Sequence, residues 1–269
     1  MMTKGDISIL LRKLHLMQAV DKLRFYYFKI KHRKKNREFL QKHPEAALPP
    51  DYYIYEAFQL NYEEYLTKSK KTAQWILDFY IKHKKREPEK VLDWGCGPGR
   101  IIRHLPALLP ASSKIYGTDY NAKSIEWCKN NLKGIDFNKN SIDAILPYND
   151  NYFDYIFGIS IFTHLSAQKH AEWIEELTRV LKPGGLMMLT THGNDFRVKL
   201  SKKELAAFDA GNIVVRDKVK EGHRTYTAYH PAEYMEKLFT GQGLKILEHV
   251  SPETISGKPQ QDVWILEKL

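Results

Sequence analysis

The sequence contains few of the residues on which small extracellular domains and membrane-spanning proteins depend. Only two of its 269 residues are cysteines, Cys96 and Cys128. Two thiols can build neither a disulfide framework nor a cysteine-rich zinc site, and such scarcity is typical of a reducing compartment. No apolar run approaches the roughly 20 residues of a spanning helix. Because Asp6, Arg12 and Lys13 interrupt the first apolar stretch, we also expect no secretory signal peptide.

The composition that remains is ordinary for a globular protein, apart from the distribution of charge. Apolar residues make up 43% and charged residues 28% of the chain, which argues against wholesale disorder. The formal net charge is +10. Residues 1–43 hold twelve Lys and Arg against three Asp and Glu, so they carry nine of the ten net positive charges. The sequence therefore predicts a basic N-terminal arm followed by a nearly neutral domain.

Strands and helices are expected to alternate from residue 90 onward. The expected strands lie at 90–94, 114–119, 135–138, 153–159 and 185–191, and the helices between them begin at about 99 or cover 121–132 and 167–181. Residues 193–230 are expected to be irregular, before a helix at 231–240 and two closing strands at about 243–250 and 261–268. This alternation predicts a doubly wound, mostly parallel α/β sheet with one antiparallel hairpin at its edge. We divide the chain into a helical extension, residues 1–85, and an α/β domain, residues 86–269.

The strongest chemical signal is the glycine-rich segment that follows the first expected strand, Asp93-Trp94-Gly95-Cys96-Gly97-Pro98-Gly99-Arg100. Glycines in such a turn let the backbone pass close to a ligand, and the start of a following helix favours an anionic group. Asp119 ends the second expected strand, where an acid typically binds ribose hydroxyls. Arg100 occupies the place where the dinucleotide fingerprint requires glycine or alanine. The pattern therefore indicates a nucleoside ligand without a pyrophosphate.

Several motifs, in the correct order, resemble those of class I S-adenosylmethionine-dependent methyltransferases. The segment D-W-G-C-G-P-G and the later G-T-D-Y resemble motifs I and II of that family, and L-K-P-G-G at 181–185 resembles its turn before strand five. The match is strong over roughly residues 88–192. The resemblance implies a Rossmann-like, seven-stranded, mostly parallel sheet with helices on both faces, and S-adenosylmethionine as the cofactor.

The resemblance also assigns the cofactor site. It gives the methionine portion to Asp93 and the glycine turn, the ribose to Asp119, and the adenine to Tyr120 and the segment after the third strand. The full set of expected cofactor-binding residues is Asp93, Gly95, Cys96, Gly97, Gly99, Asp119, Tyr120, Asn140, Ser141, Ile142 and Ile159. The chain departs from the family where an acid is common near the adenine, because Asn140 and Ser141 stand there.

The acceptor side is expected after the fourth strand, at S-I-F-T-H-L, residues 160–165. The N/D-P-P-Y/F motif of amino-methylating relatives is absent, which argues against DNA adenine and protein glutamine as acceptors. Together with T-T-H-G and the closing Q-D-V-W-I-L-E-K, this string resembles methyltransferases of bacterial surface-glycan biosynthesis. A sugar hydroxyl of a glycan or glycolipid is then the expected acceptor, with His164 or His192 as general base. RNA or small-molecule methylation and a non-catalytic, cofactor-binding scaffold remain alternatives, and no ligand set predicts a metal.

The basic arm has three interpretations, which are a solvated helix face, contact with an anionic membrane, and contact with nucleic acid. Its apolar residues recur at helical spacing and form one stripe, made of Leu10, Leu14, Met17, Val20, Leu23, Tyr27 and Ile30. An apolar stripe favours a membrane over nucleic acid, unless the stripe packs on the enzyme's own core. We expect a cytoplasmic protein, and two interpretations of residues 1–43 stay open: contact with the inner face of an anionic membrane, or packing on the domain.

Overall fold

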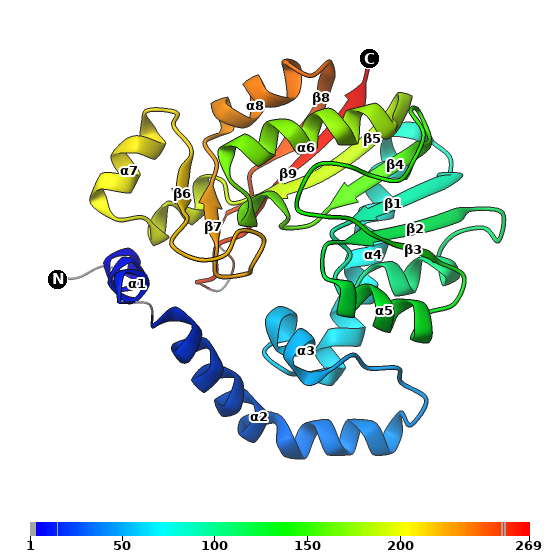
Figure 1. Ribbon diagram of the computed structural model, residues 1–269. Coiled ribbons are helices and arrows are strands. Elements are labelled where there is room, and N and C mark those ends of the chain that lie inside the picture. The colour runs from blue at the N-terminus through cyan, green and yellow to red at the C-terminus, as the bar shows by residue number, and fades with distance from the viewer. Residues whose placement is uncertain (1–3, 15, 254, 256) are drawn as a thin grey trace.

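A seven-stranded sheet forms the centre of the computed structural model, which describes residues 4–14, 16–253, 255 and 257–269 (Figure 1). The strands are β1 (Lys90–Trp94), β2 (Lys114–Asp119), β3 (Asp136–Lys139), β4 (Phe153–Gly158), β5 (Leu181–Thr191), β8 (Leu244–Val250) and β9 (Asp262–Lys268). Their order across the sheet is β3-β2-β1-β4-β5-β9-β8. The first five in that order are parallel, whereas β9 runs antiparallel to both of its neighbours. The Rossmann-like fold and the antiparallel hairpin predicted from the sequence are confirmed.

Helices cover both faces of this sheet, as strands with apolar residues on both sides require. Val91 and Leu92 alternate along β1, and each is fully buried in a different cluster of apolar side chains. The Val91 cluster includes residues of α4 and α5, and the Leu92 cluster includes residues of α6 and α8. These helices are α4 (Tyr62–Lys84), α5 (Ala122–Asn131), α6 (Ala167–Val180) and α8 (Ala232–Thr240).

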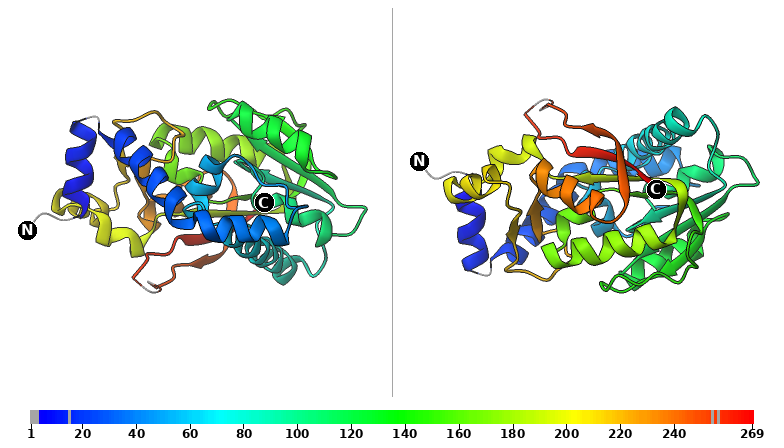
Figure 2. Two further views of the ribbon diagram at one scale, coloured as in Figure 1. Left: turned by 90° about the horizontal axis from the view of Figure 1, so that it is seen from below. Right: turned by 90° about the horizontal axis from the view of Figure 1, so that it is seen from above.

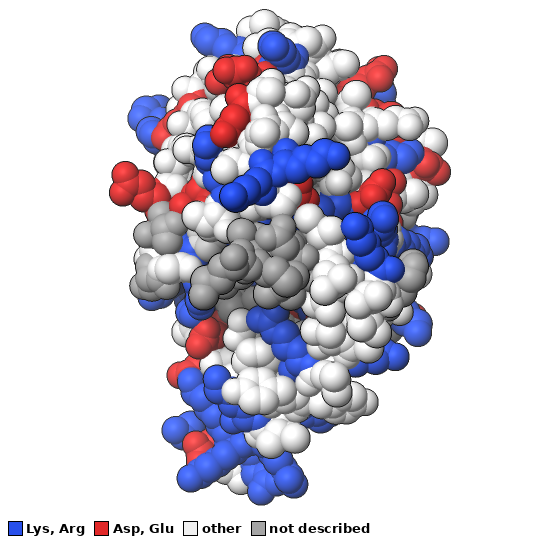
Figure 3. Space-filling model, turned by 90° about the vertical axis from the view of Figure 1, so that its left-hand side faces the viewer, with Lys and Arg blue, Asp and Glu red and all other residues white. Residues whose placement is uncertain are grey.

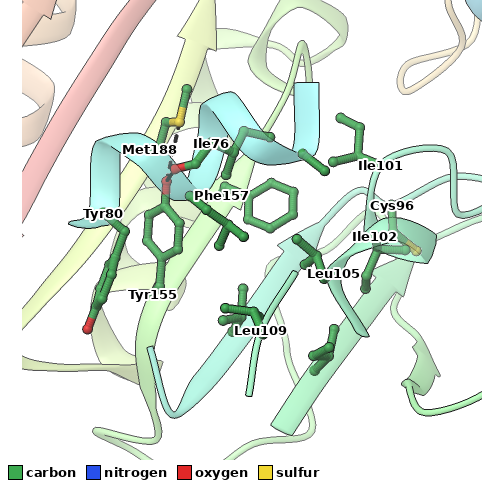
Figure 4. Packing of buried hydrophobic residues seen from close by; sticks show 14 of the residues in the cluster. Ile76, Tyr80, Cys96, Ile101, Ile102, Leu105, Leu109, Tyr155, Phe157 and Met188 are labelled. Atoms are coloured by element: carbon green, nitrogen blue, oxygen red, sulfur yellow. Dashed lines mark hydrogen bonds between the residues drawn. The ribbon is translucent and has the colours of Figure 1, made fainter. Parts of the chain in front are cut away.

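The packing beneath the glycine turn fixes its position on the sheet (Figure 4). Tyr155 of β4 is fully buried, and its hydroxyl donates a hydrogen bond to the carbonyl of Ile76 in α4 at 2.8 Å. Cys96 and Ile101, which lie in and just after the turn, belong to the same cluster of buried side chains. The turn is therefore anchored on the core by these side chains, and a ligand can approach it only from the side opposite the core.

Two expectations about local structure are wrong. The helix expected from about residue 99 is a short 3-10 helix, η1 (Ile102–Ala107), which contains Pro106. Proline lacks an amide hydrogen and its ring obstructs the preceding turn, so a regular α-helix is disfavoured there. The start of a regular helix is thus not part of the site.

The segment at 193–230 was expected to be irregular, yet it folds as a small insert beside the sheet. Its elements are η3 (Asn194–Lys199), α7 (Lys202–Asp209), β6 (Val214–Arg216) and β7 (Thr227–Tyr229). A reciprocal capping box between Ser201 and Glu204 starts α7, and the insert has an apolar cluster of its own around Phe196 and Phe208. The sequence did not predict the insert, because its small core needs few apolar residues and the segment is otherwise polar.

The N-terminal arm forms two helices, α1 (Lys4–Lys13) and α2 (Met17–Lys42), and α3 (Asp51–Phe58) follows them. Seen from below, α2 crosses the molecule in front of α3 (Figure 2). Arg12 of α1 is 5% exposed and donates hydrogen bonds to the carbonyls of Arg216 and Thr225 in the insert. Among the described residues no helix is long and apolar enough to cross a membrane. The division at residue 85 stays a prediction, although α4 packs directly on the sheet.

Candidate active site

The glycine turn after β1 is held against the end of β2. The amide of Gly95 donates to the carbonyl of Thr118 at 2.8 Å, and the amide of Gly97 donates to Asp119 Oδ2 at 2.9 Å. Gly95 has a φ of +78°, and a Cβ at this position would collide with the side chain of Ile161. Only glycine fits there, because any other residue would be strained and would fill the space above the turn.

Two buried carboxyl groups stand at the ends of the neighbouring strands β1 and β2. Asp93 is 3% exposed and Asp119 is 8% exposed. Burial raises the pKa of Asp93 to about 8, against the opposing attraction of Arg100. Burial also raises the pKa of Asp119 to about 6, although two backbone amides donate to this carboxylate and stabilise its charge. Burial thus disfavours the ionised form of both carboxyl groups. A ligand that brings positive charge or hydroxyl donors to them would stabilise this form.

A cavity of about 610 Å³ opens above the turn. Of the residues predicted to bind the cofactor, Asp93, Gly95, Cys96, Gly97 and Ile159 line this cavity. The other walls come from α3, α4, the loop after β4 and the insert. Burial raises the pKa of the Cys96 thiol well above its usual value, so this side chain is a neutral wall residue.

Gly99 stands apart from the other glycines of the turn. It is not among the residues that line the cavity, and a Cβ at this position would collide with Leu132 at the end of α5. The structure therefore connects Gly99 with the packing of the turn against α5, and its expected contact with the cofactor stays a prediction.

A narrower pocket of about 60 Å³ shares Gly95 and His164 with the cavity above the turn. It is lined by the remaining predicted residues, Asp119, Tyr120, Asn140, Ser141 and Ile142. The Oδ1 atom of Asn140 is buried and accepts no hydrogen bond from the described residues, so it is available to an amino group such as that of adenine. Trp94 and Gly222 are among its other lining residues.

Sequence reasoning missed the groups that the N-terminal helices and the insert bring over the cavity. Glu56 of α3 and Arg224 of the insert both line it. Burial, and then the nearby charge of Asp119, raises the pKa of Glu56 to about 7. The guanidinium of Arg224 contacts the carboxylate of Asp21 in α2 and donates a hydrogen bond to the hydroxyl oxygen of Tyr55 at 3.0 Å. No local pattern could identify these residues, because contacts across about 200 positions of sequence assemble them.

The insert also reaches the narrower pocket. The hydroxyl of Tyr120 donates to the carbonyl of Gly222 at 3.0 Å, and the amide of Gly222 donates to the carbonyl of His164 at 2.9 Å. Gly222 has a φ of +81°, which a residue with a side chain rarely adopts. This glycine was not singled out from the sequence, because the segment around it was expected to be an irregular loop.

The two predicted histidines occupy different environments. His164 lines both the cavity and the narrower pocket, and its Nδ1 lies 2.8 Å from the carbonyl oxygen of Tyr226. His192 lines neither; its ring stacks on Phe196 with centroids 3.9 Å apart, and its Nδ1 lies 3.1 Å from the carbonyl oxygen of Ala228. Burial lowers the pKa of His192 to about 3, and burial lowers that of His164 as well.

The donor set fits S-adenosylmethionine. A zwitterionic sulfonium ligand would bring positive charge to Asp93 and Glu56, and its ribose hydroxyls could donate to Asp119, each oxygen of which accepts one amide bond. The unpartnered Oδ1 of Asn140 suits the adenine amine. Among the described residues, no cluster of three or more His, Cys, Asp or Glu side chains could hold a metal ion.

Several known proteins that are similar to this chain are methyltransferases. Residues 91–185 match the family model described as "Methyltransferase domain". Over 133 residues the chain is 32% identical to the ubiquinone/menaquinone biosynthesis C-methyltransferase UbiE of Pseudomonas paraeruginosa, a match that covers 46% of this chain and 48% of that protein. Over 171 residues it is 26% identical to the tRNA N(3)-cytidine methyltransferase METTL2 of Mus musculus, with 60% and 42% covered. The chain thus spans about half the length of these curated relatives.

A solved S-adenosylmethionine-dependent methyltransferase from Clostridium acetobutylicum has the same fold. Its TM-score is 0.57 at 15% identity, over 81% of this chain and 97% of that one. The fold and the match mark residues 91–185 as a methyltransferase domain, and the fold is shared with S-adenosylmethionine-dependent methyltransferases.

Proposed function

We propose that this protein transfers the methyl group of S-adenosylmethionine to a hydroxyl group of a sugar, on a glycan or glycolipid that enters the cavity beside His164. When bound, the cofactor supplies a methyl group on a positively charged sulfur, which is an activated leaving group. The protein's own tasks are to align the acceptor oxygen, to exclude water and to take up the hydroxyl proton. Because a hydroxyl is a weak nucleophile, the residue that takes up its proton is central to the proposed reaction.

The observation that carries this proposal is the hydrogen bond at His164. A carbonyl oxygen can only accept, so the Nδ1 atom 2.8 Å from the Tyr226 carbonyl holds the proton of the neutral ring. The lone pair is then on Nε2, where it can accept a proton from a hydroxyl group in the cavity. Burial lowers the pKa of His164, which keeps the ring neutral and ready to act as a base at pH 7.

The proposal retains His164 as the base and assigns His192 to the support of the insert. His192 stacks on Phe196, contacts the tilted ring of Tyr229 and lies outside both cavities. His230 is fully buried, with its ring centroid 5.0 Å from that of His170, so it does not reach an acceptor either. A base with access to the cavity therefore has one candidate among these three histidines.

The lining of the cavity supports a sugar acceptor. Glu56, Lys68, Thr72, Ser160 and Arg224 give it several hydrogen-bonding side chains. A sugar can satisfy such groups with its own hydroxyls, whereas an apolar ring would leave them unpaired. The relatives that act in quinone biosynthesis and on tRNA make a small aromatic molecule and RNA the alternatives to be tested alongside it.

The test is a screen with labelled S-adenosylmethionine against soluble sugars, lipid-linked glycans, quinols and tRNA, followed by two matched variants. With the acceptor found, His164→Ala should lower turnover by about 10²–10⁴ and change the affinity for S-adenosylhomocysteine far less, although this residue lines both pockets. His192→Ala should retain most of the turnover. Near-normal turnover of His164→Ala would remove the base from this residue, and a preference for tRNA or quinol would replace the sugar.

A non-catalytic scaffold is distinguished by the cofactor alone. A working enzyme slowly forms S-adenosylhomocysteine without any acceptor, and Asp93→Ala should abolish that reaction. A protein that binds the cofactor and never forms the product would be a scaffold. We place the reaction in the cytoplasm, with residues 1–43 holding the enzyme at the inner face of an anionic membrane.

A further inference from the structure

The long helix α2 is fixed in its orientation by the side that faces the protein. On that side Phe28 is buried against Tyr55 of α3, with ring centroids 6.2 Å apart. Asn36 donates to the carbonyl of Leu60 at 2.8 Å and accepts the amide of Tyr62 at 3.2 Å. Because contacts of this kind run along much of the helix, they also determine which side of α2 faces outward.

The outward side carries a continuous row of apolar side chains. We call this row, formed by Leu16, Val20, Leu23, Tyr27 and Ile30, the outer stripe. Its members follow one another at steps of four and three residues, which places them on one helical face. All are exposed, and Leu23 and Ile30 reach 70% and 77%. The stripe therefore does not pack on the enzyme's own core, contrary to the alternative left open from the sequence.

The exposed apolar surface of the chain is concentrated here. Of the sixteen exposed large apolar residues among those described, nine lie between residues 10 and 40. A row of this kind is unusual on a surface that meets only water, and it marks a place of contact. The partner must offer an apolar surface that can bury leucine and isoleucine side chains along the length of the helix.

Basic side chains surround the stripe, and acids are missing from it. Arg24 and Lys31 lie beside it, and Lys34 and Arg37 continue its spacing toward the end of α2. Between residues 10 and 37 the one acid in the sequence is Asp21, which is buried on the inner side. Figure 3 shows blue side chains gathered at the lower end of the molecule, where α2 runs in Figure 1.

Two ion pairs on α2 lie outside this group of cations. Lys29 pairs with Asp51 and Lys35 with Glu63, each at 2.9 Å. In the part of the chain that the structure describes, no carboxylate forms an ion pair with the four cations at the stripe, Arg24, Lys31, Lys34 and Arg37. Arg24 and Lys31 lie over the ring of Phe28, and no described carboxylate neutralises the charge of any of the four.

We propose that the outer stripe and these four cations dock the protein on an anionic lipid bilayer, with α2 lying in the plane of the interface. Interfacial helices combine an apolar face that sinks about 5–10 Å into the headgroup boundary with cations that meet anionic lipids. The acidic headgroups complement a face that carries only positive charge, and the acyl chains receive Leu23 and Ile30.

The other occupants fit less well. A second copy of α2 would bring Arg24, Lys31 and Lys34 against the same cations, and like charges would oppose the pairing. Nucleic acid would meet the cations but would leave the apolar stripe in water. A bilayer satisfies both features of the face at once.

The helix that carries this docking face also borders a cavity next to the site. This third cavity, of about 460 Å³, is bordered by Lys31 and His32 of α2 and shares Ala57, Phe58 and Lys68 with the lining of the cofactor cavity. This last step rests on the proposed function: an enzyme docked in this way would act on a glycan attached to a membrane lipid.

The experiment is co-sedimentation of the full-length protein with vesicles, using neutral phosphatidylcholine and phosphatidylcholine containing about 30% phosphatidylglycerol. The protein should bind the anionic vesicles at least about 10-fold more tightly, and added salt should weaken the binding. The double variant Leu23→Glu/Ile30→Glu should lose at least about 10-fold of this affinity. The control Ile145→Glu, at a site 71% exposed and outside α2, should bind as the unchanged protein does.

Calorimetry with S-adenosylhomocysteine separates this proposal from the proposed function, because the double variant should bind the product normally. The docking proposal is overturned if the unchanged protein ignores anionic vesicles at low salt, or if the double variant binds them equally well. A dimer in solution that the double variant dissolves would assign the stripe to a second copy. Binding of RNA that is lost with the double variant would assign it to nucleic acid.

Discussion

Replacing Asp93 by asparagine should stabilise the protein in the absence of cofactor and weaken its hold on the cofactor. Burial raises the pKa of this carboxyl group from its ordinary 3.8 to about 8. The folded chain thus binds the proton more tightly than the unfolded chain does. Stability from this group is fully present below about pH 4 and is lost as the pH rises toward 8. Asparagine has the same shape, carries no charge and does not titrate, so its advantage should grow with pH.

The magnitude follows from the size of the shift. Each pH unit between the two pKa values costs the unchanged protein about 1.4 kcal/mol of unfolding free energy. From 3.8 to pH 7 this gives an upper bound of about 4 kcal/mol, and relaxation of a real site reduces it. We expect Asp93→Asn to gain about 1–4 kcal/mol at pH 7 and little at pH 5. Its affinity for S-adenosylhomocysteine should fall, because the neutral amide no longer attracts the ammonium group.

The assay is urea unfolding of the cofactor-free protein at several values between about pH 5 and 8, together with calorimetry. Asp119 titrates in both proteins, so the difference between them reports on Asp93. Asp78→Asn, on the exposed side of α4, is the control and should show no such trend. The reasoning is refuted if Asp93→Asn is the less stable protein at pH 7, or if its advantage does not shrink on acidification.

Two further predictions concern the same strand ends. Asp119→Ala should weaken the binding of S-adenosylmethionine by about 1.5–3 kcal/mol, the scale for hydrogen bonds to a charged group; calorimetry measures it, and unchanged affinity in a folded variant would remove Asp119 from the ribose site. Gly95→Ala should lower the unfolding free energy by about 2–4 kcal/mol, since the new Cβ meets Ile161. Gly184→Ala, at a φ of +70° with no atom near the new Cβ, isolates the backbone contribution, so equal losses in thermal or urea unfolding would argue against the collision.

The central sheet could be predicted because local signals and tertiary structure agree there. Apolar runs at 90–94 and 153–159 are buried on both faces, so their sequence shows both the strands and the helices that must cover them. The positions of Asp93 and Asp119 follow from the same rule, because parallel strands bring their carboxyl ends to one edge. The site could be placed as far as these strand ends reach.

The cover of the site could not be predicted, because it is built from distant segments with little local pattern. Glu56 stands in a helix whose tyrosines suggest packing, and Arg224 stands in a polar stretch with no regular period. Each acquires its role from partners that only the folded chain supplies. The helix expected from about 99 failed for a local reason, since Pro106 prevents it.

The two sides of α2 make different contacts. On its inner side Asp21 accepts hydrogen bonds from Tyr52 and Tyr55 and contacts Arg224 above the cavity. On its outer side lie Leu23 and Ile30, which nothing in the described chain covers. The outer side of α2 is therefore connected to the cavity through the helix itself and through the contact between Asp21 and Arg224. The inner side of the arm thus supports Arg224 at the wall of the cavity, and its outer side carries the surface for which we propose a membrane contact.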